Sequence, residues 1–217
     1  GREIKALFEH AEIEKVFDRQ GVSEMFGIGP SHTPGTTVFK NIFEIKPAHF
    51  GVYNSSGFHL ERYWKLTTKK HTDSFDETGN KIRFLLEDSI SRQLVSDVPI
   101  CTFLSGGLDS SIISKFSSDY FEKQGLEPLN TYSIDYIDND KNFVKSDFQP
   151  NSDDYYIELM NRHLRNNHYK IVIDTPELAS YLKDAMVARD MPGMADSDSS
   201  LLLFCKNVKN KMTVALT

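Results

Sequence analysis

The sequence has few cysteines and no long apolar run. Only Cys101 and Cys205 occur among the 217 residues, and neither lies in a Cys-x-x-Cys pair. This excludes a disulfide framework and a paired-cysteine metal or redox motif. No apolar stretch approaches the roughly 18 residues of a membrane-spanning helix, and the charged start GREIKALFEH is unlike a signal peptide. We therefore expect a cytoplasmic protein that does not enter a membrane.

An excess of positive charge is also missing. Lys and Arg number 25 against 31 Asp and Glu, which gives a formal net charge of −6. No overall positive field is available to hold a phosphodiester backbone, so nucleic acid is not an expected partner. The composition, 39% hydrophobic and 26% charged, is that of an ordinary globular protein. The length allows one large domain or parts of two.

Residues 1–65 and 66–217 differ in pattern. The first region carries two short helical patterns and a Pro/Gly/Thr-rich loop at 30–37. Alternating apolar residues on both sides of Asn54–Gly57 then predict an antiparallel hairpin, with strands at 48–53 and 58–64. The polar run at 66–74 follows and predicts a linker, so we place the domain boundary there.

After this linker, long helical patterns alternate with short apolar strands. Strands are predicted at 98–104, 131–136, 169–173 and 213–216. A helical stripe at 82–94 precedes the first strand, and further stripes at 112–121, 153–165 and 199–209 lie between the strands. Another helix is expected after Thr175, which we expect to cap it. This order is typical of an α/β fold with a parallel sheet and crossover helices.

The first of these strands runs directly into SGGLDSS and then into a helix. At such a turn, unpaired backbone N–H groups and the positive end of the helix dipole converge, which suits a phosphate. Gly106 and Gly107 let an anion approach the backbone closely. Asp109 would repel phosphates unless a cation lies between them, so we interpret it as a Mg²⁺ ligand. Three hydroxyls can donate to phosphate oxygens: Ser105, Ser110 and Ser111.

A plain capped turn would explain the two glycines and one serine or aspartate, but not the whole set. At about 7% per residue type, Ser-Gly-Gly-x-Asp-Ser arises by accident in roughly one chain of this length in several thousand. The patterns GxxxxGK[ST] and GxGxxG are absent, which disfavours an ordinary P-loop NTPase and a dinucleotide enzyme.

A family resemblance rests on this motif and its surroundings. LSGGLDSS is similar to the pyrophosphate loop of N-type ATP pyrophosphatases, which split ATP between the α and β phosphates. VPICTFLSGGLDSSIIS, followed by TYSIDY, DMPGMADSDSS and MTVALT, resembles the glutamine-hydrolysing asparagine synthetase family. SEMFGIG, TPGTTVFKNIFEIKPAHF and ERYW resemble the tail of that family's glutaminase domain, so the likeness covers essentially the whole chain.

The resemblance implies a fold for each region. Residues 66–217 would be the N-terminal part of the synthetase domain, with the Rossmann-like adenine nucleotide α-hydrolase (PP-loop ATP pyrophosphatase) fold. Residues 1–65 would be the α+β tail of an Ntn-type glutaminase domain. The chain starts without Met and stops after an apolar strand, so we expect a segment of a longer protein.

The resemblance also implies roles for individual residues. Asp109 would be the metal ligand and, with Ser105, a catalytic residue. Adenine would meet the backbone at Phe103 or Leu104 and at Ile134, and Thr217 falls where relatives have the Ser that opens the next nucleotide motif. The following would hold the pyrophosphate and its Mg²⁺: Ser105, Gly106, Gly107, Asp109, Ser110 and Ser111.

The implied reaction joins aspartate to AMP and lets ammonia from glutamine displace AMP to give asparagine. Pyrophosphate is the leaving group, so donors and Mg²⁺ at the β and γ phosphates would stabilise the developing charge. The attacking group is the substrate's own carboxylate, so activation is mainly positioning. Expected ligands are ATP, Mg²⁺, aspartate, and ammonia or glutamine through the missing glutaminase domain, and a homodimer is possible.

The chain departs from the family pattern in three ways. Gly1 is not a Cys, so no candidate glutaminase nucleophile is present. The family's second acid for Mg²⁺ would follow Thr217, so we expect the isolated segment to be inactive. Asp135 stands where many relatives have Gly, so a local difference in loop shape is expected.

Other interpretations remain open. The same loop serves β-lactam and macrolactam synthetases and tRNA-thiolating enzymes, although the glutaminase-like flank argues against the last. A non-catalytic nucleotide-binding module is an alternative from another class. Asp196 and Asp198 either line the active cleft or belong to a helix cap formed by Asp198 or Ser199.

Overall fold

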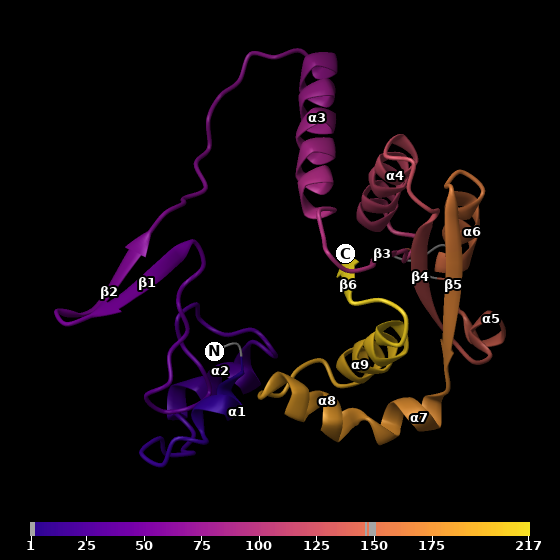
Figure 1. Ribbon diagram of the computed structural model, residues 1–217. Coiled ribbons are helices and arrows are strands. Elements are labelled where there is room, and N and C mark those ends of the chain that lie inside the picture. Colours follow the sequence, from indigo (N-terminus) through magenta and orange to yellow (C-terminus); the bar gives the residue numbers. More distant parts are fainter. Residues whose placement is uncertain (1–2, 146, 148–150) are drawn as a thin grey trace. The chain divides into compact units, whose positions relative to one another are not determined.

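The computed structural model describes residues 3–145, 147 and 151–217, so Gly1 lies outside the described residues. The chain divides into two compact units (Figure 1). The first unit contains residues 1–71 and 182–199, and the second contains residues 72–181 and 200–217. The predicted domain boundary at 65/66 and the assignment of the two domains stay predictions.

The first unit contains short helices and a two-stranded hairpin. Its elements are α1 (Ile4–Leu7), α2 (Arg19–Gly27), β1 (His49–Asn54), β2 (Gly57–Arg62), α8 (Leu182–Arg189) and the start of α9 (Asp196–Lys209). β1 and β2 pair antiparallel, and Asn54 lies opposite Gly57, whose φ of 104° suits the tight turn. The predicted hairpin is thus confirmed.

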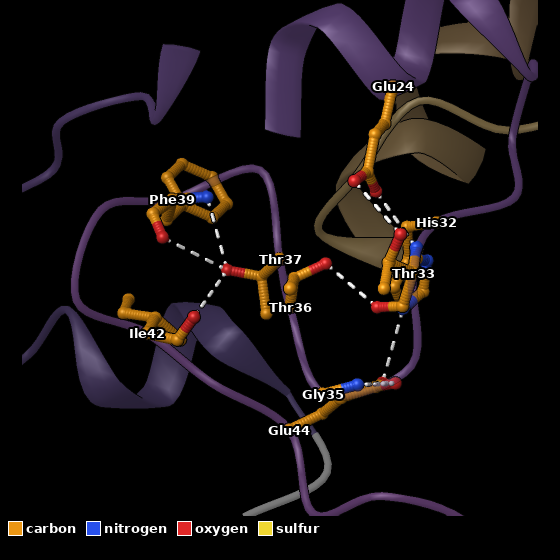
Figure 2. A network of polar contacts seen from close by, with 9 residues as sticks. All are labelled: Glu24, His32, Thr33, Gly35, Thr36, Thr37, Phe39, Ile42 and Glu44. Atoms are coloured by element: carbon orange, nitrogen blue, oxygen red, sulfur yellow. Dashed lines mark hydrogen bonds and ion pairs between the residues drawn. The ribbon is translucent and has the colours of Figure 1, made fainter. Parts of the chain in front are cut away.

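Two glutamates organise the Pro/Gly/Thr-rich loop between α2 and β1 (Figure 2). Glu24 accepts hydrogen bonds from the backbone N–H and the hydroxyl of Thr33, at 2.8 and 2.9 Å. Glu44 accepts the N–H of Gly35 at 3.1 Å and lies 3.2 Å from the ring of His32. The polar side chains of this loop therefore bind the loop's own backbone.

The second unit is an α/β structure. Its helices are α3 (Phe75–Gln93), α4 (Leu108–Lys123), α5 (Asn139–Asn142), α6 (Asp153–Asn161), α7 (Thr175–Ser180) and the rest of α9. Its strands are β3 (Ile100–Phe103), β4 (Leu129–Tyr136), β5 (Asn166–Ile173) and β6 (Val214–Leu216). They form one parallel sheet in the order β5-β4-β3-β6, which confirms the predicted α/β class.

Helices cover both faces of this sheet. On one face, Cys101 and Tyr132 are buried against Phe204 and Val208 of α9. On the other face, Leu104 is buried against Ile157 of α6, and the hydroxyl of Thr102 lies 2.8 Å from that of Ser114 in α4. The alternation of side chains along β3 thus places α9 on one side and α4 and α6 on the other.

The strand order reverses once. From β3 the chain steps to β4 and then to β5, after which it returns to place β6 on the opposite side of β3. In open parallel sheets, ligands bind at the carboxyl ends of the strands where the order reverses. The fold therefore points to the ends of β3 and β6.

Some boundaries differ from the sequence predictions. α7 begins at Thr175, and its N-cap position is held by Asp174, so the expected Thr175 cap is wrong. α9 begins at Asp196, three residues before the predicted start. α3 begins at Phe75, directly after the predicted linker and seven residues before the predicted stripe, because Ser74 and Glu77 form a capping box there.

The predicted apolar stripe of α3 is buried only toward its C-terminus. Ile90 and Leu94 belong to the core, whereas Ile82 and Leu85 are exposed. Within the part of the chain that the structure describes, no helix combines the length and apolar character needed to cross a membrane.

Candidate nucleotide-binding site

The predicted strand, turn and helix are present at the carboxyl end of β3. β3 ends at Phe103, and the buried Leu104 continues its direction by donating its N–H to the carbonyl of Tyr132 at 2.8 Å. After three intervening residues α4 begins at Leu108. The turn thus lies at an inner strand, next to the reversal of strand order.

Gly106 is required by the geometry of this turn. Its φ is 81°, in the left-handed region that residues with a Cβ rarely adopt. A Cβ at this position would lie 2.7 Å from the carbonyl oxygen of Asp153 and 3.3 Å from Cβ of Tyr156, both in α6. The start of α6 therefore packs directly against the turn.

Gly107 leaves the start of α4 open. It is the N-cap residue of α4 and has no side chain with which to cap the first turn. Gly107, Leu108 and Asp109 are all exposed, and the first N–H groups of α4 have no hydrogen-bond partner among the described residues. These donors and the helix dipole form a site suited to an anion.

The three serine hydroxyls surround the same turn. Ser110 accepts the N–H of Ser105 at 3.2 Å and donates to the carbonyl of Gly107 at 3.1 Å. Ser111 donates to the same carbonyl at 2.7 Å, and the hydroxyls of Ser105 and Ser110 are 3.0 Å apart. The structure brings the hydroxyls together, and each can rotate toward a ligand.

Asp109 is an exposed carboxylate in the first turn of α4. Among the described residues, none forms a hydrogen bond or ion pair with its side chain, and no three potential metal-ligand side chains cluster. Mg²⁺ is commonly held by one or two carboxylates together with waters and substrate phosphates. A single free carboxylate beside a site suited to an anion is consistent with this mode of Mg²⁺ coordination. The role of Asp109 as a metal ligand stays a prediction.

β4 extends beyond the end of β3, which exposes part of its backbone. The carbonyl of Tyr132 faces β3, because it accepts the N–H of Leu104. Backbone groups alternate sides along a strand, so Ile134 faces the same way. β3 has ended by then, and no backbone group of the described residues pairs with Ile134 on this side. Ile134 therefore offers unpaired backbone groups at the predicted adenine position.

Phe103 and Thr217 lie near the same edge. The half-buried ring of Phe103 packs edge-on against Phe204 at a centroid distance of 4.6 Å. Leu216 of β6 lies opposite Thr102 of β3, so the exposed Thr217 follows at the carboxyl end of the neighbouring strand. Every residue predicted to contact the nucleotide thus lies at the carboxyl ends of β3, β4 and β6 or in the turn.

Asp196 and Asp198 belong to the first unit. α9 begins at Asp196, so neither Asp198 nor Ser199 is its N-cap residue. The carboxylate of Asp198 instead accepts the N–H of Met194 at 2.7 Å and pairs with Arg189 at 2.6 Å. The capping interpretation is therefore wrong in position, and Asp198 closes the turn that precedes α9.

The sequence did not reveal a charged cluster near the turn. The Lys170 ammonium on β5 donates to Asp154 at 2.7 Å and to Asp135 at 3.3 Å. Asp135 also accepts the N–H of Tyr136 at 2.8 Å and the amide of Asn139 at 3.0 Å. In the sequence, Asp135 stands out as a departure from the family pattern. Its partner Lys170, on the neighbouring strand, cannot be identified from spacing along the chain.

The contacts of this cluster favour the charged forms of Lys170 and Asp135. Burial opposes the charge of Lys170, but its hydrogen bonds to Asp154 and Asp135 outweigh this and raise the pKa of its ammonium group. Burial likewise opposes ionised Asp135. Hydrogen bonds from Tyr136 and Asn139, together with Lys170, still lower the pKa of its carboxyl group.

A parallel sheet with an open, glycine-rich turn at its strand reversal defines an α/β protein, and the geometry of this turn suits an anion. Comparison with known families identifies the group more closely. The model of the family described as asparagine synthase matches residues 81–217. The chain belongs to this family.

Similar curated proteins carry related names. The chain is 52% identical over all 217 residues to asparagine synthetase [glutamine-hydrolyzing] 3 of Bacillus subtilis (strain 168), of which it spans 35%. Over 58 residues, 23% of the chain, it is 56% identical to asparagine synthetase B [glutamine-hydrolyzing] of Escherichia coli (strain K12), of which it spans 10%. It is also 30% identical over 104 residues, 46% of the chain, to amidase chry2 of Gibberella zeae, of which it spans 15%. The chain thus covers about a third or less of these relatives.

Proposed function

We propose that the chain is part of an ATP-dependent asparagine synthetase. Residues 66–217 would form the N-terminal part of a PP-loop ATP pyrophosphatase domain, and residues 1–65 the α+β tail of an Ntn-type glutaminase domain. One observation carries the proposal: the turn of Ser105–Ser111 lies open at the strand reversal, with Gly106 in a conformation that excludes other residues. The family membership supports the choice of reaction.

The proposed chemistry assigns the turn to pyrophosphate. The first N–H groups of α4 and the hydroxyls of Ser105, Ser110 and Ser111 would donate to the β and γ phosphates of ATP. Because these donors are already in place, they would stabilise the negative charge that gathers on pyrophosphate as the α–β bond breaks. Asp109 would hold Mg²⁺, which neutralises phosphate charge when it is bound.

The nucleoside would be positioned by backbone groups. The free N–H and carbonyl of Ile134, with the backbone at Phe103 and Leu104, would meet the edge of adenine. Thr217, at the end of β6, would contact the nucleotide from the other side of the strand reversal. The carboxylate of aspartate would then attack the α phosphorus, and ammonia would displace AMP from the acyl-adenylate to give asparagine.

The ammonia would come from glutamine. Residues 1–65 contain no cysteine, so the nucleophile that hydrolyses glutamine would lie in a part of the whole protein outside these 217 residues. Cys101 cannot take this role, because it is fully buried in β3 and burial raises the pKa of its thiol to about 11.

The product of ATP cleavage tests the proposal. In the whole protein we expect aspartate-dependent conversion of ATP to AMP and pyrophosphate, and we expect Asp109→Ala to abolish it. Formation of ADP would contradict the proposal. Pyrophosphate exchange with a panel of carboxylic acids would separate aspartate from other acceptors, such as the precursors of β-lactams or macrolactams.

The 217-residue chain itself allows a simpler measurement. Calorimetric titration with ATP and Mg²⁺ should detect binding that Asp109→Ala weakens. Absence of binding by the unaltered chain would contradict the proposed role of the turn in this segment.

A further inference from the structure

The charged cluster of Lys170, Asp154 and Asp135 joins three elements of the second unit. Lys170 lies in β5, Asp135 near the end of β4, and Asp154 in the first turn of α6. Lys170 is the cation between two carboxylates, with the shorter contact, 2.7 Å, to Asp154. The cluster therefore ties the N-terminal turn of α6 to the sheet.

The same turn of α6 forms one wall of the glycine turn. Asp153 precedes Asp154, and its carbonyl oxygen would lie 2.7 Å from a Cβ on Gly106. With α6 in this place there is room for a glycine but not for a side chain at position 106, so a shift of the helix start would change the wall against which Gly106 packs. The position of α6 therefore limits the conformations open to Ser105–Gly107.

Loss of Lys170 would act directly on this contact. Without the ammonium group, Asp154 and Asp135 would face each other as like charges in a region where Asp135 is largely shielded, its side chain being 17% exposed. Repulsion would displace the helix turn, because β4 is fixed in the sheet by pairing with both β3 and β5.

We propose that Lys170 is a positioning residue for the pyrophosphate turn: by bridging Asp135 and Asp154, it holds the start of α6 against Gly106. The expected effect on ATP binding rests on the proposed function, whereas the expected effect on the conformation of the turn does not. Lys170 does not contact phosphate in this role, because both of its partners are carboxylates of the protein.

Hydrogen exchange and ATP binding together test the inference on the 217-residue chain. In Lys170→Met we expect the amides of residues 105–111 to exchange faster without nucleotide, and the dissociation constant for ATP with Mg²⁺ to rise about fivefold. Lys170→Arg should restore most of both. A matched control is Lys123→Met, which also removes one positive charge and one ion pair, that with Glu87 at 3.0 Å, and should change neither measurement.

Asp154→Asn separates positioning from a general electrostatic field. If Lys170 acted only by offsetting negative charge near the phosphates, removal of the Asp154 charge would strengthen ATP binding. Positioning predicts the opposite sign, because the contact that holds α6 is weakened. Tighter binding by Asp154→Asn, or unchanged exchange of residues 105–111 in Lys170→Met, would overturn the inference. Unaltered chain that fails to bind ATP would count against the proposed function alone, since the exchange measurement still decides the positioning role.

Discussion

Two glycine-containing polar loops of this chain have opposite uses for their polar groups. In the loop between α2 and β1, the N–H groups of Thr33 and Gly35 donate to Glu24 of α2 and to Glu44, so these donors have partners within the protein (Figure 2). In the turn between β3 and α4, neither the first N–H groups of α4 nor the Asp109 carboxylate has a partner among the described residues.

The difference separates a structural loop from a binding loop. Both loops contain glycine, hydroxyl residues and an acid nearby, so composition alone does not distinguish them. What distinguishes them is whether the backbone donors and the acid have partners. In the β3–α4 turn the serine hydroxyls bond to the turn itself, but the first N–H groups of α4 and the Asp109 carboxylate have no partner among the described residues. Polar groups that are occupied stabilise the fold, whereas free groups that are held in place can bind a ligand.

Replacing a positive-φ glycine in each loop should give the largest contrast. Gly106→Ala should weaken binding of ATP with Mg²⁺ about 100-fold, because the new methyl group meets the backbone of α6 and moves the turn. Gly35→Ala, at φ 97°, should cost about 1 to 3 kcal/mol of stability and leave binding unchanged, since its methyl group meets only the flexible Lys46 side chain. Calorimetric titration and urea denaturation measure the two effects. Equal loss of binding in both variants would remove the distinction.

Removing one hydroxyl from each loop should give a smaller contrast. Ser110→Ala should raise the dissociation constant for ATP about tenfold, through loss of a hydrogen bond to a charged group. It should cost only about 0.5 to 1 kcal/mol of stability, because the exposed Ser110 hydroxyl also bonds to Ser105 and Gly107. Thr37→Val should cost about 1 to 2 kcal/mol instead, because the buried Thr37 hydroxyl donates to the carbonyl of Ile42 at 2.8 Å. If Ser110→Ala proved the more destabilising of the two, the β3–α4 turn would be mainly structural.

Lowering the pH should reduce the stability of the α2–β1 loop, and this is the smallest of the expected effects. The Thr33 N–H is the largest of the hydrogen bonds that lower the pKa of Glu24 below 4.5. Burial opposes ionisation of Glu44, yet the Gly35 N–H and His32 lower its pKa as well. Folded-state pKa values below the unfolded ones give stability that is complete above about pH 4.5 and is lost as pH falls through the folded values. Urea denaturation between pH 3 and 7 should show this loss as a fall in the free energy of unfolding. In Glu24→Gln, the free energy of unfolding should fall less steeply with pH. An identical slope in the variant would show that Glu24 does not contribute.

Much of the second unit follows from sequence pattern. The apolar run before Ser105 predicts a strand, because the strands of a parallel sheet are covered on both faces and are therefore continuously apolar. The glycines after it predict the turn that leads into a helix. β5 was predicted too short: its first residues, Asn166 to His168, are polar and gave no strand signal. His168 is nevertheless half-buried there, with its ring nitrogens 2.9 and 3.0 Å from the hydroxyls of Thr131 and Ser133.

The remaining features depend on contacts between distant residues. The capping box of Ser74 and Glu77 was legible in the sequence and was missed. The pairing of Lys170 with Asp135 depends on the register of β4 and β5, which places Asp135 opposite Val172. Packing of Asp153 against Gly106 depends on where α6 lies. Neither can be read from one sequence, because spacing along the chain does not fix which side chains meet across a sheet.

The longer reach of β4 past the end of β3 bears on how readily base preference could be redesigned. If the main chain at position 134 reads the base, exchanging the isoleucine for valine or leucine alters the packing beneath but leaves the recognising atoms in place. Substitution there should be tolerated, and a change from adenine to another base would require a strand to be shortened or lengthened. Specificity of this kind is a property of strand length, which point mutation rarely alters.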